Sequence, residues 1–476
     1  MSTTIELIRK YSNTEHMVIF TKDKSKFNEA FFTENEAAYV KQQLTADQKT
    51  IAVNQYNRTI FLQVIDKKDD KYKMYEALRK AGDGMAAALN KIKASSVILY
   101  DEKHGDELLA YAEGMALGNY QFIKYKAEKE KEQNKLTSIK ICCGALKQKQ
   151  IDQLNIIADA TCRARDLVNE PNSHQTATKL ADSFKQLGKE AGFQVEVFNK
   201  NKIESMKMGG LLAVNKGSVE PPTFTVMEYK PARPVNKKPI ILVGKGVVYD
   251  TGGLSLKPTP NSMDLMKCDM AGSAVVACTM FAIAKAKLPV HVVALAPATD
   301  NRPGGNAYAP GDVIHMMNGS TVEMLNADAE GRMILADALH FAKQYEPSLV
   351  CEFSTLTGAA AAAVGQYGVV VMGTASDKIK KQLVNSGNSV YERLAEFPFW
   401  DEYDDLLKSD IADMKNIGGP IAGAITAGKF LTRYSDYPFM HFDIAGPAFI
   451  TARDSYRGKG GTGFGVRLMF EFLKGM

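Results

Sequence analysis

The sequence predicts an α/β fold: a smaller N-terminal α/β domain and a larger C-terminal domain whose mostly parallel central sheet is flanked by helices. Three observations lead to this prediction. The chain has 476 residues, which exceeds the roughly 100–200 residues of one ordinary domain. Hydrophobic residues make up 45% of it and charged residues 24%, a normal globular balance. Beyond residue 172, strand-like apolar runs alternate with amphipathic helical stretches, as expected of parallel strands joined by helical crossovers.

The first 120 residues contain short strand-like runs separated by helical stretches. We expect strands at Met17–Phe20, Thr59–Val64 and Ser96–Tyr100, and helices at Lys71–Lys91 and Asp106–Leu117. This pattern predicts a small α/β domain. No cluster of potential ligands is recognisable in it.

The stretch from Lys124 to Lys149 is the largest shift in composition along the chain, and we interpret it as a solvated edge or an insertion beside a strand. Residues Ile151–Asn169 have helical apolar spacing and precede Glu170–Pro171, which predicts a helix that joins two domains. The expected organisation is therefore an N-terminal α/β domain over 1–150, a linking helix over 151–171 and a main domain over 172–476.

The main domain supplies the predicted sheet and the helices that cover it. The expected strands are Thr223–Tyr229, Pro239–Tyr249, Val290–Ala296, Ser348–Leu356, Gly368–Met372 and Phe439–Ile444. The expected helices are Ala177–Ala191, Ala271–Lys285, Gly331–Tyr345 and a final one near Gly465–Lys474. Ligands of such sheets bind at the carboxyl ends of the strands, so the polar residues that follow these strands are candidates for a functional site.

Composition narrows the compartment and the partners. Six cysteines without C-x-x-C spacing argue against a disulfide framework or a cysteine zinc site and fit a reducing cytoplasm. The formal net charge of +5 is modest and gives little reason to expect a nucleic-acid partner. No apolar run reaches the roughly 18 residues that span a bilayer, and the N-terminus lacks the apolar segment of a secretory signal. We expect a cytoplasmic protein with no membrane partner.

Charged residues gather at strand-to-helix junctions. In PIILVGKGVVYDTGGLSLKP an apolar strand is followed by Lys245, Asp250 and Lys257, between glycines that let the backbone turn sharply. In MDLMKCDMAGSA, Asp269 stands at the start of the next helix. These residues are expected at one edge of the sheet.

A third junction follows in MLNADAEGRMILADAL, where Asp328, Glu330 and Arg332 stand directly before a helix. Any one of these carboxylates could simply close a turn or complement a helix dipole. Four carboxylates at one edge, however, would repel one another unless cations hold them. All-oxygen ligation suits Mg, Mn or, with bridging carboxylates, a Zn pair. Two metals roughly 3.5–4 Å apart can lower the pKa of a bridging water and polarise a carbonyl.

Other catalytic motifs are missing or incomplete. No H-E-x-x-H occurs, and none of the seven histidines pairs at ligand spacing, so a histidine zinc site is not expected. Gly423–Lys429 is similar to a phosphate-binding loop, but Phe430 stands where that loop needs a hydroxyl group. No G-x-S-x-G occurs, so a serine hydrolase is not supported.

The three junctions resemble the consecutive active-site motifs of the leucyl aminopeptidase family of metallopeptidases. The similarity rests on VGKGVVYDTGGLSLKP, MDLMKCDMAGSA and NADAEGR, and continues through RDLVNEPN, KMGGLLAVNKGS, STLTGA, ADMKNIGG, GAITAGKFL and HFDIAGPA. It extends from about Arg165 to the last residues, whereas the N-terminal domain is assigned by position only. Ala327 stands where the family usually has threonine; it is not a ligand in this scheme, so we expect activity to survive.

The resemblance implies a dinuclear metal site, with zinc or manganese as the ions. Asp250 and Glu330 would bridge the two ions. Asp328 would complete one site, and Lys245 and Asp269 would complete the other. A lysine ligand must be neutral, which burial beside two dications allows. Residues 172–476 would then form a dinuclear-metal peptidase domain.

Two further residues would act in catalysis. Lys257 would stay charged and stabilise the oxyanion as the peptide carbonyl becomes tetrahedral. Arg332 would hold a bicarbonate ion that serves as general base, because a guanidinium group stays protonated and cannot itself be the base. The implied reaction is hydrolysis of the N-terminal peptide bond of peptides by a metal-bridging hydroxide.

The resemblance also implies specificity and assembly. A free amino terminus would coordinate the metal beside Asp269, so that only the first peptide bond reaches the nucleophile. The side-chain pocket would be lined by Met266, Thr355, Gly358, Ala445 and Ala448. These residues are mostly small or apolar and favour Leu- or Met-like N-terminal residues. A homohexamer is the implied assembly.

Two alternatives stay open. One is another two-metal hydrolase such as a phosphoesterase, because carboxylate-bridged metals serve both chemistries. The other is a DNA-binding or regulatory protein on the same scaffold, which only the modest positive charge favours. A neutral lysine ligand and an apolar pocket argue against the phosphoesterase.

Overall fold

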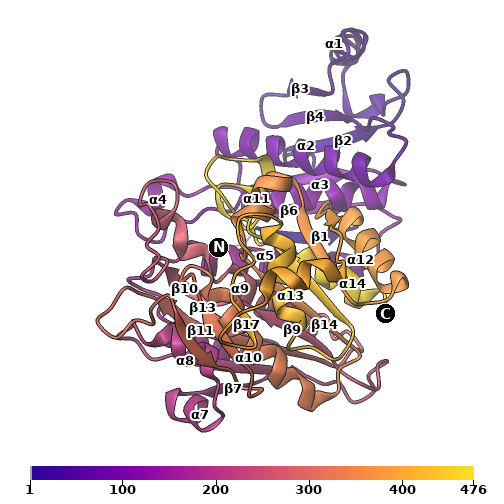
Figure 1. The fold of residues 1–476 in the computed structure, drawn as a ribbon. Coiled ribbons are helices and arrows are strands. Elements are labelled where there is room, and N and C mark those ends of the chain that lie inside the picture. Colours follow the sequence, from indigo (N-terminus) through magenta and orange to yellow (C-terminus); the bar gives the residue numbers. More distant parts are fainter. Residues whose placement is uncertain (1–2) are drawn as a thin grey trace. The chain divides into compact units, whose positions relative to one another are not determined.

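The structure is a computed structural model that describes residues 3–476. The chain divides into two compact units. One runs up to Cys162 and also contains Arg453–Gly458, and the other contains Arg163–Ala452 and Lys459–Met476. Each unit is an α/β structure (Figure 1). The division falls within helix α5, Gln148–Asn169.

The N-terminal unit is built on a six-stranded sheet with the order β1-β6-β5-β2-β4-β3, in which all neighbours are parallel except β3 and β4. The strands are β1 Thr4–Ile8, β2 Met17–Thr21, β3 Thr50–Asn54, β4 Thr59–Val64, β5 Ser96–Tyr100 and β6 Ser138–Cys142. Three of them were predicted. β6 lies within the lysine-rich stretch, where charge hides the short apolar run.

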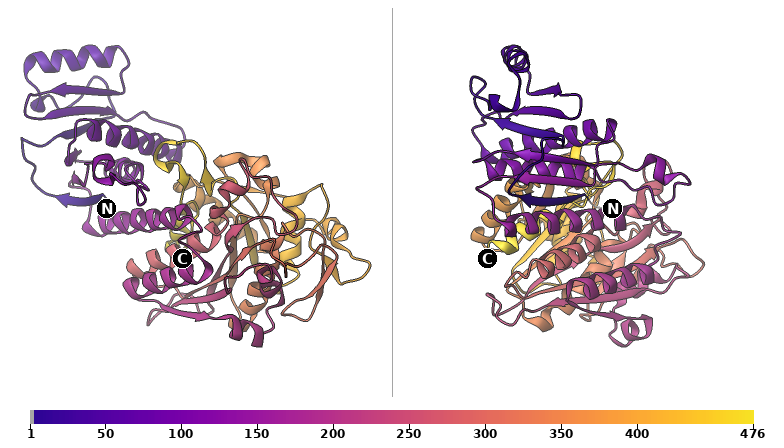
Figure 2. Two further views of the ribbon diagram at one scale, coloured as in Figure 1. Left: turned by 90° about the vertical axis from the view of Figure 1, so that its left-hand side faces the viewer. Right: turned by 180° about the vertical axis from the view of Figure 1, so that it is seen from behind.

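Helices cover both faces of this sheet. α2 (Lys71–Lys91) and α3 (Gly105–Gly118) pack on each other and, with α5, enclose one core cluster; α1 (Glu34–Thr45) lies over the other (Figure 2). The contact between α2 and α3 is close, because a Cβ atom at Gly114 would stand 1.9 Å from the carbonyl oxygen of Arg79. Both helices were predicted. The remaining helix of the unit is the short α4, Lys129–Glu132.

The C-terminal unit contains a nine-stranded, mostly parallel sheet with the order β16-β15-β18-β14-β9-β11-β8-β7, to which β10 is added by pairing with β11. The strands are β7 Gln194–Phe198, β8 Thr223–Tyr229, β9 Ile240–Gly244, β10 Gly246–Asp250, β11 Val292–Asn301, β14 Leu349–Ser354, β15 Val369–Gly373, β16 Leu394–Glu396 and β18 Phe439–Asp443. Smaller ladders are formed by β12 Asp312–His315, β13 Thr321–Met324 and β17 Met414–Lys415, and by β19 Phe449–Ile450 and β20 Gly460–Gly461. The predicted fold class is confirmed.

The helices of this unit also lie on both faces of the sheet (Figures 1 and 2). Four helices pack together on one face: α6 Ala177–Ala191, α9 Ala271–Lys285, α12 Asp377–Ser389 and α14 Val466–Lys474. α8 Gly209–Asn215, α10 Glu330–Ala342 and α13 Gly423–Thr432 share the core on the other. Two short helices, α7 Lys200–Ser205 and α11 Gly358–Val364, complete the unit.

α9 is apolar around its whole circumference, as expected of a helix buried inside a domain. Together with the preceding 3₁₀ turn, Met263–Lys285 is long and apolar enough to cross a membrane by length and composition alone, but 89% of its most apolar window is buried inside the fold. It is therefore a core helix of the C-terminal unit. The strands β9 and β14 pack against it.

Two strand predictions were wrong in ways that matter for the site. The run Pro239–Tyr249 is divided at Lys245 into two strands, β9 and β10, which both pair parallel with β11. The strand predicted to end at Ala296 runs on to Asn301, since residues Pro297 and Ala298 still pair with β8 and the end of β11 pairs with β10. Both differences arise from pairing across the sheet, which a local apolar pattern does not encode.

Candidate metal centre

Lys245 is the single residue between β9 and β10. Its backbone N–H donates to the carbonyl oxygen of Phe353 on β14 at 3.0 Å, which anchors this position to the sheet. The Nζ atom lies 2.7 Å from Asp269 Oδ2 and 2.8 Å from Glu330 Oε1. Gly331 leaves the room that this side chain needs, because a Cβ atom there would stand 2.4 Å from Lys245 Cε. The ammonium group is thus held between two carboxylates.

Asp250 ends β10 and faces a second lysine. A turn through Gly252 and Gly253, with φ angles of +86° and +58°, reverses the chain after Asp250 and brings Lys257 back towards it. Positive φ angles of this kind favour glycine. Lys257 Nζ lies 2.9 Å from Asp250 Oδ2 and also contacts Asp328. The second ammonium group therefore joins carboxylates from two different segments.

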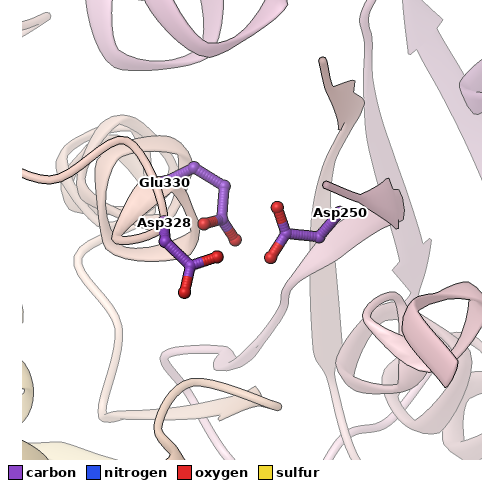
Figure 3. A group of neighbouring side chains, drawn as sticks. All are labelled: Asp250, Asp328 and Glu330. Carbon is purple, nitrogen blue, oxygen red and sulfur yellow. The ribbon is translucent and has the colours of Figure 1, made fainter. Parts of the chain in front are cut away.

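Asp328 and Glu330 approach Asp250 from the start of α10. Figure 3 shows the three carboxyl groups pointing towards one another, Asp250 from its strand and the other two from the helix start. One oxygen of each lies within 4.8 Å of the others. Asp250 and Glu330 are buried, and Asp328 is partly buried. Three of the four predicted carboxylates therefore meet at a single point.

Asp269, the fourth carboxylate, closes the 3₁₀ turn Met263–Cys268 just before α9. It reaches the cluster through Lys245, whose Nζ lies 2.8 Å from Asp269 Oδ1. The hydroxyl group of Thr355, which follows β14, donates to the same oxygen at 2.8 Å. Thr355 was expected only to line a pocket, and the structure gives it a second contact with a candidate ligand.

The electrostatics of the two lysines are set by the carboxylates around them. Burial by itself lowers the pKa of each lysine, but the negative charges outweigh it, led by Asp269 for Lys245 and by Asp250 for Lys257. The pKa of both ammonium groups is therefore raised above its ordinary value. Without metal, both lysines are charged and neutralise part of the cluster.

Two of the carboxyl groups, Asp328 and Asp269, have a raised pKa. Burial, reinforced by the charges of Asp250 and Glu330, raises the pKa of Asp328 to about 7. Burial also raises the pKa of Asp269 well above its usual range, although the Lys245 charge opposes this. Four carboxylates face two ammonium groups, so the ionised cluster carries an excess of two negative charges.

This donor set fits divalent metal ions. Within residues 3–476, both carboxylate oxygens of Glu330, Asp269 Oδ2 and Asp328 Oδ1 are buried and lack a hydrogen bond of good geometry, although lysine ammonium groups lie close to three of these four atoms. Buried polar atoms are normally satisfied, and each exception calls for an explanation such as an ion. Convergent oxygen donors with excess negative charge are the ligands that Mg²⁺, Mn²⁺ and carboxylate-bridged Zn²⁺ take.

Arg332 lies two residues after Glu330, in the first turn of α10, and is buried. Its Nη1 donates to the carbonyl oxygen of Asn416 at 2.6 Å, whereas its Nε has no partner among the described residues. Burial lowers the pKa of Arg332 to about 10 and the negative charges of Glu330 and Asp443 oppose this, so the guanidinium stays charged near neutral pH. The arrangement leaves an unused donor next to the carboxylate cluster, which suits a small anion.

The five predicted pocket residues come from three places. Met266 lies on the 3₁₀ turn before α9, Thr355 and Gly358 follow β14, and Ala445 and Ala448 follow the adjacent strand β18. Ala448 is buried, and Gly358 is exposed with open space where a Cβ atom would stand. Two of the five contact the candidate ligand Asp269: the Thr355 hydroxyl donates to its carboxylate, and the Met266 carbonyl oxygen accepts from its backbone N–H.

Two buried asparagines belong to the site and were missed by the sequence analysis. Asn301 Nδ2 donates to Asp250 Oδ1 at 2.8 Å. Asn416 Oδ1 accepts from the backbone N–H of Leu325 at 2.9 Å, and the backbone carbonyl oxygen of Asn416 accepts from Arg332. A signal for Asn301 existed, because the polar residues T-D-N end a long apolar run in the same way as the predicted ligands do. The wrong end assigned to this strand concealed it.

A carboxylate and lysine cluster at the strand ends of a helix-covered sheet defines a metal-dependent hydrolase. Residues 162–470 match the model of a family described as "Cytosol aminopeptidase family, catalytic domain". The chain belongs to this family, and it is a metal-dependent aminopeptidase, as the resemblance implied. The assignment favours the peptidase over the phosphoesterase and the DNA-binding scaffold.

Named relatives agree with this assignment. The chain is 48% identical over 385 residues to a probable cytosol aminopeptidase of Chlorobaculum tepidum, covering 78% of this chain and 76% of that one. It is 41% identical over 411 residues to a probable cytosol aminopeptidase of Geotalea uraniireducens, covering 84% and 82%. Among solved structures, the bottromycin maturation enzyme BotP in complex with Mn superposes with a TM-score of 0.86 at 27% identity, over 98% and 99% of the two chains. A tomato leucine aminopeptidase mutant, at 24% identity and a TM-score of 0.87 over 100% and 97%, shares the fold.

Proposed function

We propose that this aminopeptidase hydrolyses the first peptide bond of peptides with Leu- or Met-like N-terminal residues by a two-metal mechanism. The observation that carries the proposal is the meeting of Asp250, Asp328 and Glu330, whose oxygens lie within 4.8 Å of one another. Lys245 extends the cluster to Asp269 with contacts of 2.7 and 2.8 Å.

In this proposal five side chains hold two divalent ions. The ions would be held by Asp250, Glu330, Asp328, Asp269 and Lys245. When bound, two divalent ions would supply an ionised water as nucleophile and polarise the peptide carbonyl. Lys245 would have to be neutral to act as a ligand, and neighbouring positive charge lowers the pKa of an ammonium group.

Lys257 and Arg332 act on the reacting groups. Lys257 keeps its proton and stabilises the oxyanion, and its position beside Asp250 supports this role. Arg332 would hold a bicarbonate ion, which would supply a general base there; the Nε without a partner among the described residues and the charge on the buried guanidinium support this role. Arg332 itself transfers no proton.

The substrate's free amino terminus binds beside Asp269, which restricts cleavage to the first peptide bond. The pocket for the N-terminal side chain is lined by Met266, Thr355, Gly358, Ala445 and Ala448. Their small or apolar character supports the preference for Leu and Met. The link from Thr355 to Asp269 supports a pocket that adjoins the amino-terminus site.

The identity of the ions and the assembly are part of the proposal. Manganese is supported by the Mn complex of BotP and by the carboxylate-rich donor set, and zinc only by the resemblance stated above. A cytoplasmic location is supported by the name of the family, and a homohexamer by the resemblance stated above. Light scattering on the purified chain measures the assembly.

An anilide panel tests the proposal. Leucyl, methionyl, alanyl and aspartyl anilides are assayed with the metal-free enzyme, after addition of Mn²⁺ or Zn²⁺, and with Asp328→Ala as the matched inactive variant. We expect hydrolysis of the leucyl and methionyl substrates only with metal and only in the wild type. Turnover by Asp328→Ala at the wild-type rate after metal replacement would contradict the ligand assignment.

A further inference from the structure

Asn301 connects two segments of the metal centre with one amide group. It is the last residue of β11 and is fully buried, with 0% of its surface exposed. Its Nδ2 donates to Asp250 Oδ1 at 2.8 Å and to the carbonyl oxygen of Ala327 at 2.9 Å. Ala327 directly precedes Asp328, so both N–H bonds of the amide are directed at segments that carry candidate ligands.

The orientation of this amide follows from its surroundings. Both neighbours of Nδ2 are oxygen acceptors, so the flipped amide would place an oxygen against two oxygens. In the observed orientation Asn301 Oδ1 has no partner among residues 3–476. A Cβ atom at Gly253 would stand 2.8 Å from that oxygen, which explains why the turn after Asp250 passes so close to it.

The contact selects which oxygen of Asp250 faces the cluster. Oδ1 receives both Asn301 and the backbone N–H of Gly252, at 2.8 Å each. Oδ2 is left with Lys257 alone, at 2.9 Å. Protein donors therefore saturate one oxygen and leave the other directed at the space that Asp250 shares with the other carboxylates.

The second contact fixes the loop that carries Asp328. The Ala327 carbonyl also accepts from the hydroxyl group of Tyr308 at 3.0 Å, and the Ala327 N–H donates to Ser255 Oγ at 3.0 Å. Asn301 is the one of these three groups that also touches a candidate ligand. It sets the spacing between Asp250 and Asp328, which come from distant parts of the chain.

We propose that Asn301 is a positioning residue that pre-forms the metal site by orienting Asp250 and holding the Asp328 loop. This inference rests on the proposed two-metal function. Partners of this kind, which orient ligands without touching the metal, affect metal affinity by about 10–100-fold. Asn301 contributes no ligand and transfers no proton.

Metal affinity is the readout that separates positioning from a structural role. Mn²⁺ binding to the metal-free full-length chain is measured by competition with a chromogenic chelator, and the thermal midpoint of the metal-free chain is measured alongside. Asn301→Leu removes the amide and keeps the branched shape of the side chain in a bulkier form, and Asn301→Ala leaves room for a water in case the leucine variant does not fold. Asn215→Leu is the matched control, because Asn215 is a buried asparagine that donates to Glu220 O and Thr299 Oγ1 and touches no candidate ligand.

Both Asn301 variants are expected to bind Mn²⁺ about 10–100-fold more weakly, whereas Asn215→Leu binds it as the wild type does even if its thermal midpoint falls. Unchanged Mn²⁺ affinity in Asn301→Ala, with a midpoint lowered as in the control, overturns the inference and leaves Asn301 a structural residue. Failure of the wild type to bind Mn²⁺ or Zn²⁺ is a different result and overturns the proposed function itself.

Discussion

Replacing Lys257 by methionine separates transition-state stabilisation from substrate binding. The change keeps most of the aliphatic stem and removes one positive charge from a cluster with an excess of two negative charges. In the proposed mechanism this charge would face the developing oxyanion. Loss of one donor to an oxyanion typically costs about 10²–10³ in kcat, or about 3–4 kcal/mol. The Lys257 side chain is only 15% exposed, so water replaces it poorly and the upper part of that range applies.

The same substitution has opposite effects on the metal-free and metal-loaded forms. Without metal, Asp250 and Asp328 lose the ammonium group that joins them, which lowers the free energy of unfolding by about 3 kcal/mol, as for a broken buried pair. With metal, removal of Lys257 removes a cation that repels the ions, so metal affinity does not fall. We therefore expect a large loss in kcat, a small change in KM, and metal binding at least as tight as in the wild type.

Leucyl-anilide kinetics of the metal-loaded enzyme and calorimetric titration with Mn²⁺ measure these quantities. Lys285→Met is the control, since Lys285 lies at the exposed end of α9 away from the cluster. Its kinetics should equal those of the wild type. A variant of Lys257 with a raised KM and an unchanged kcat, or with tenfold weaker Mn²⁺ binding, would refute the oxyanion role and make Lys257 a structural counter-ion.

Three further predictions follow from particular contacts. Gly331→Ala should lower kcat by more than about 100-fold, because the new Cβ atom would stand 2.4 Å from Lys245 Cε and displace the lysine; Gly305→Ala, which meets nothing within 4 Å, should be active in the same assay. Glu330→Gln should abolish both activity and Mn²⁺ binding while circular dichroism stays unchanged, because one buried bridging charge is lost; retention of full Mn²⁺ affinity would argue that Glu330 is not a ligand. Burial raises the pKa of Asp337 to about 7, although backbone N–H groups of Leu211 and Met317 oppose this. The pKa of Asp337 in the folded protein lies above the unfolded value of about 3.9, so the free energy of unfolding of the wild type should fall by up to about 4 kcal/mol relative to Asp337→Asn as the pH rises from 4 to 7. Urea unfolding at both pH values measures this difference. The same dependence on pH in both proteins would show that Asp337 is not buried as an acid.

Much of the site was accessible from the sequence because its residues follow apolar strands. Lys245, Asp250, Asp328 and Glu330 stand at junctions whose apolar and glycine patterns mark the strand ends, and the resemblance stated above implies the same residues. The two strand errors lie in the same region. The break at Lys245 was hidden because the apolar run continues on both sides of it.

The sequence by itself determined the alternation of strands and helices, the family, and the residue types that supply oxygen donors and counter-charges, because these are local or collinear properties of the chain. Only the tertiary structure decided which of the donors meet. Asp250 and Asp328 are brought together by pairing between β10 and β11 and by the amide of Asn301. Thr355 reaches Asp269 because the end of β14 lies next to the turn before α9. Such contacts depend on the register and length of paired strands, which are set by distant segments and cannot be read from the residues around either partner.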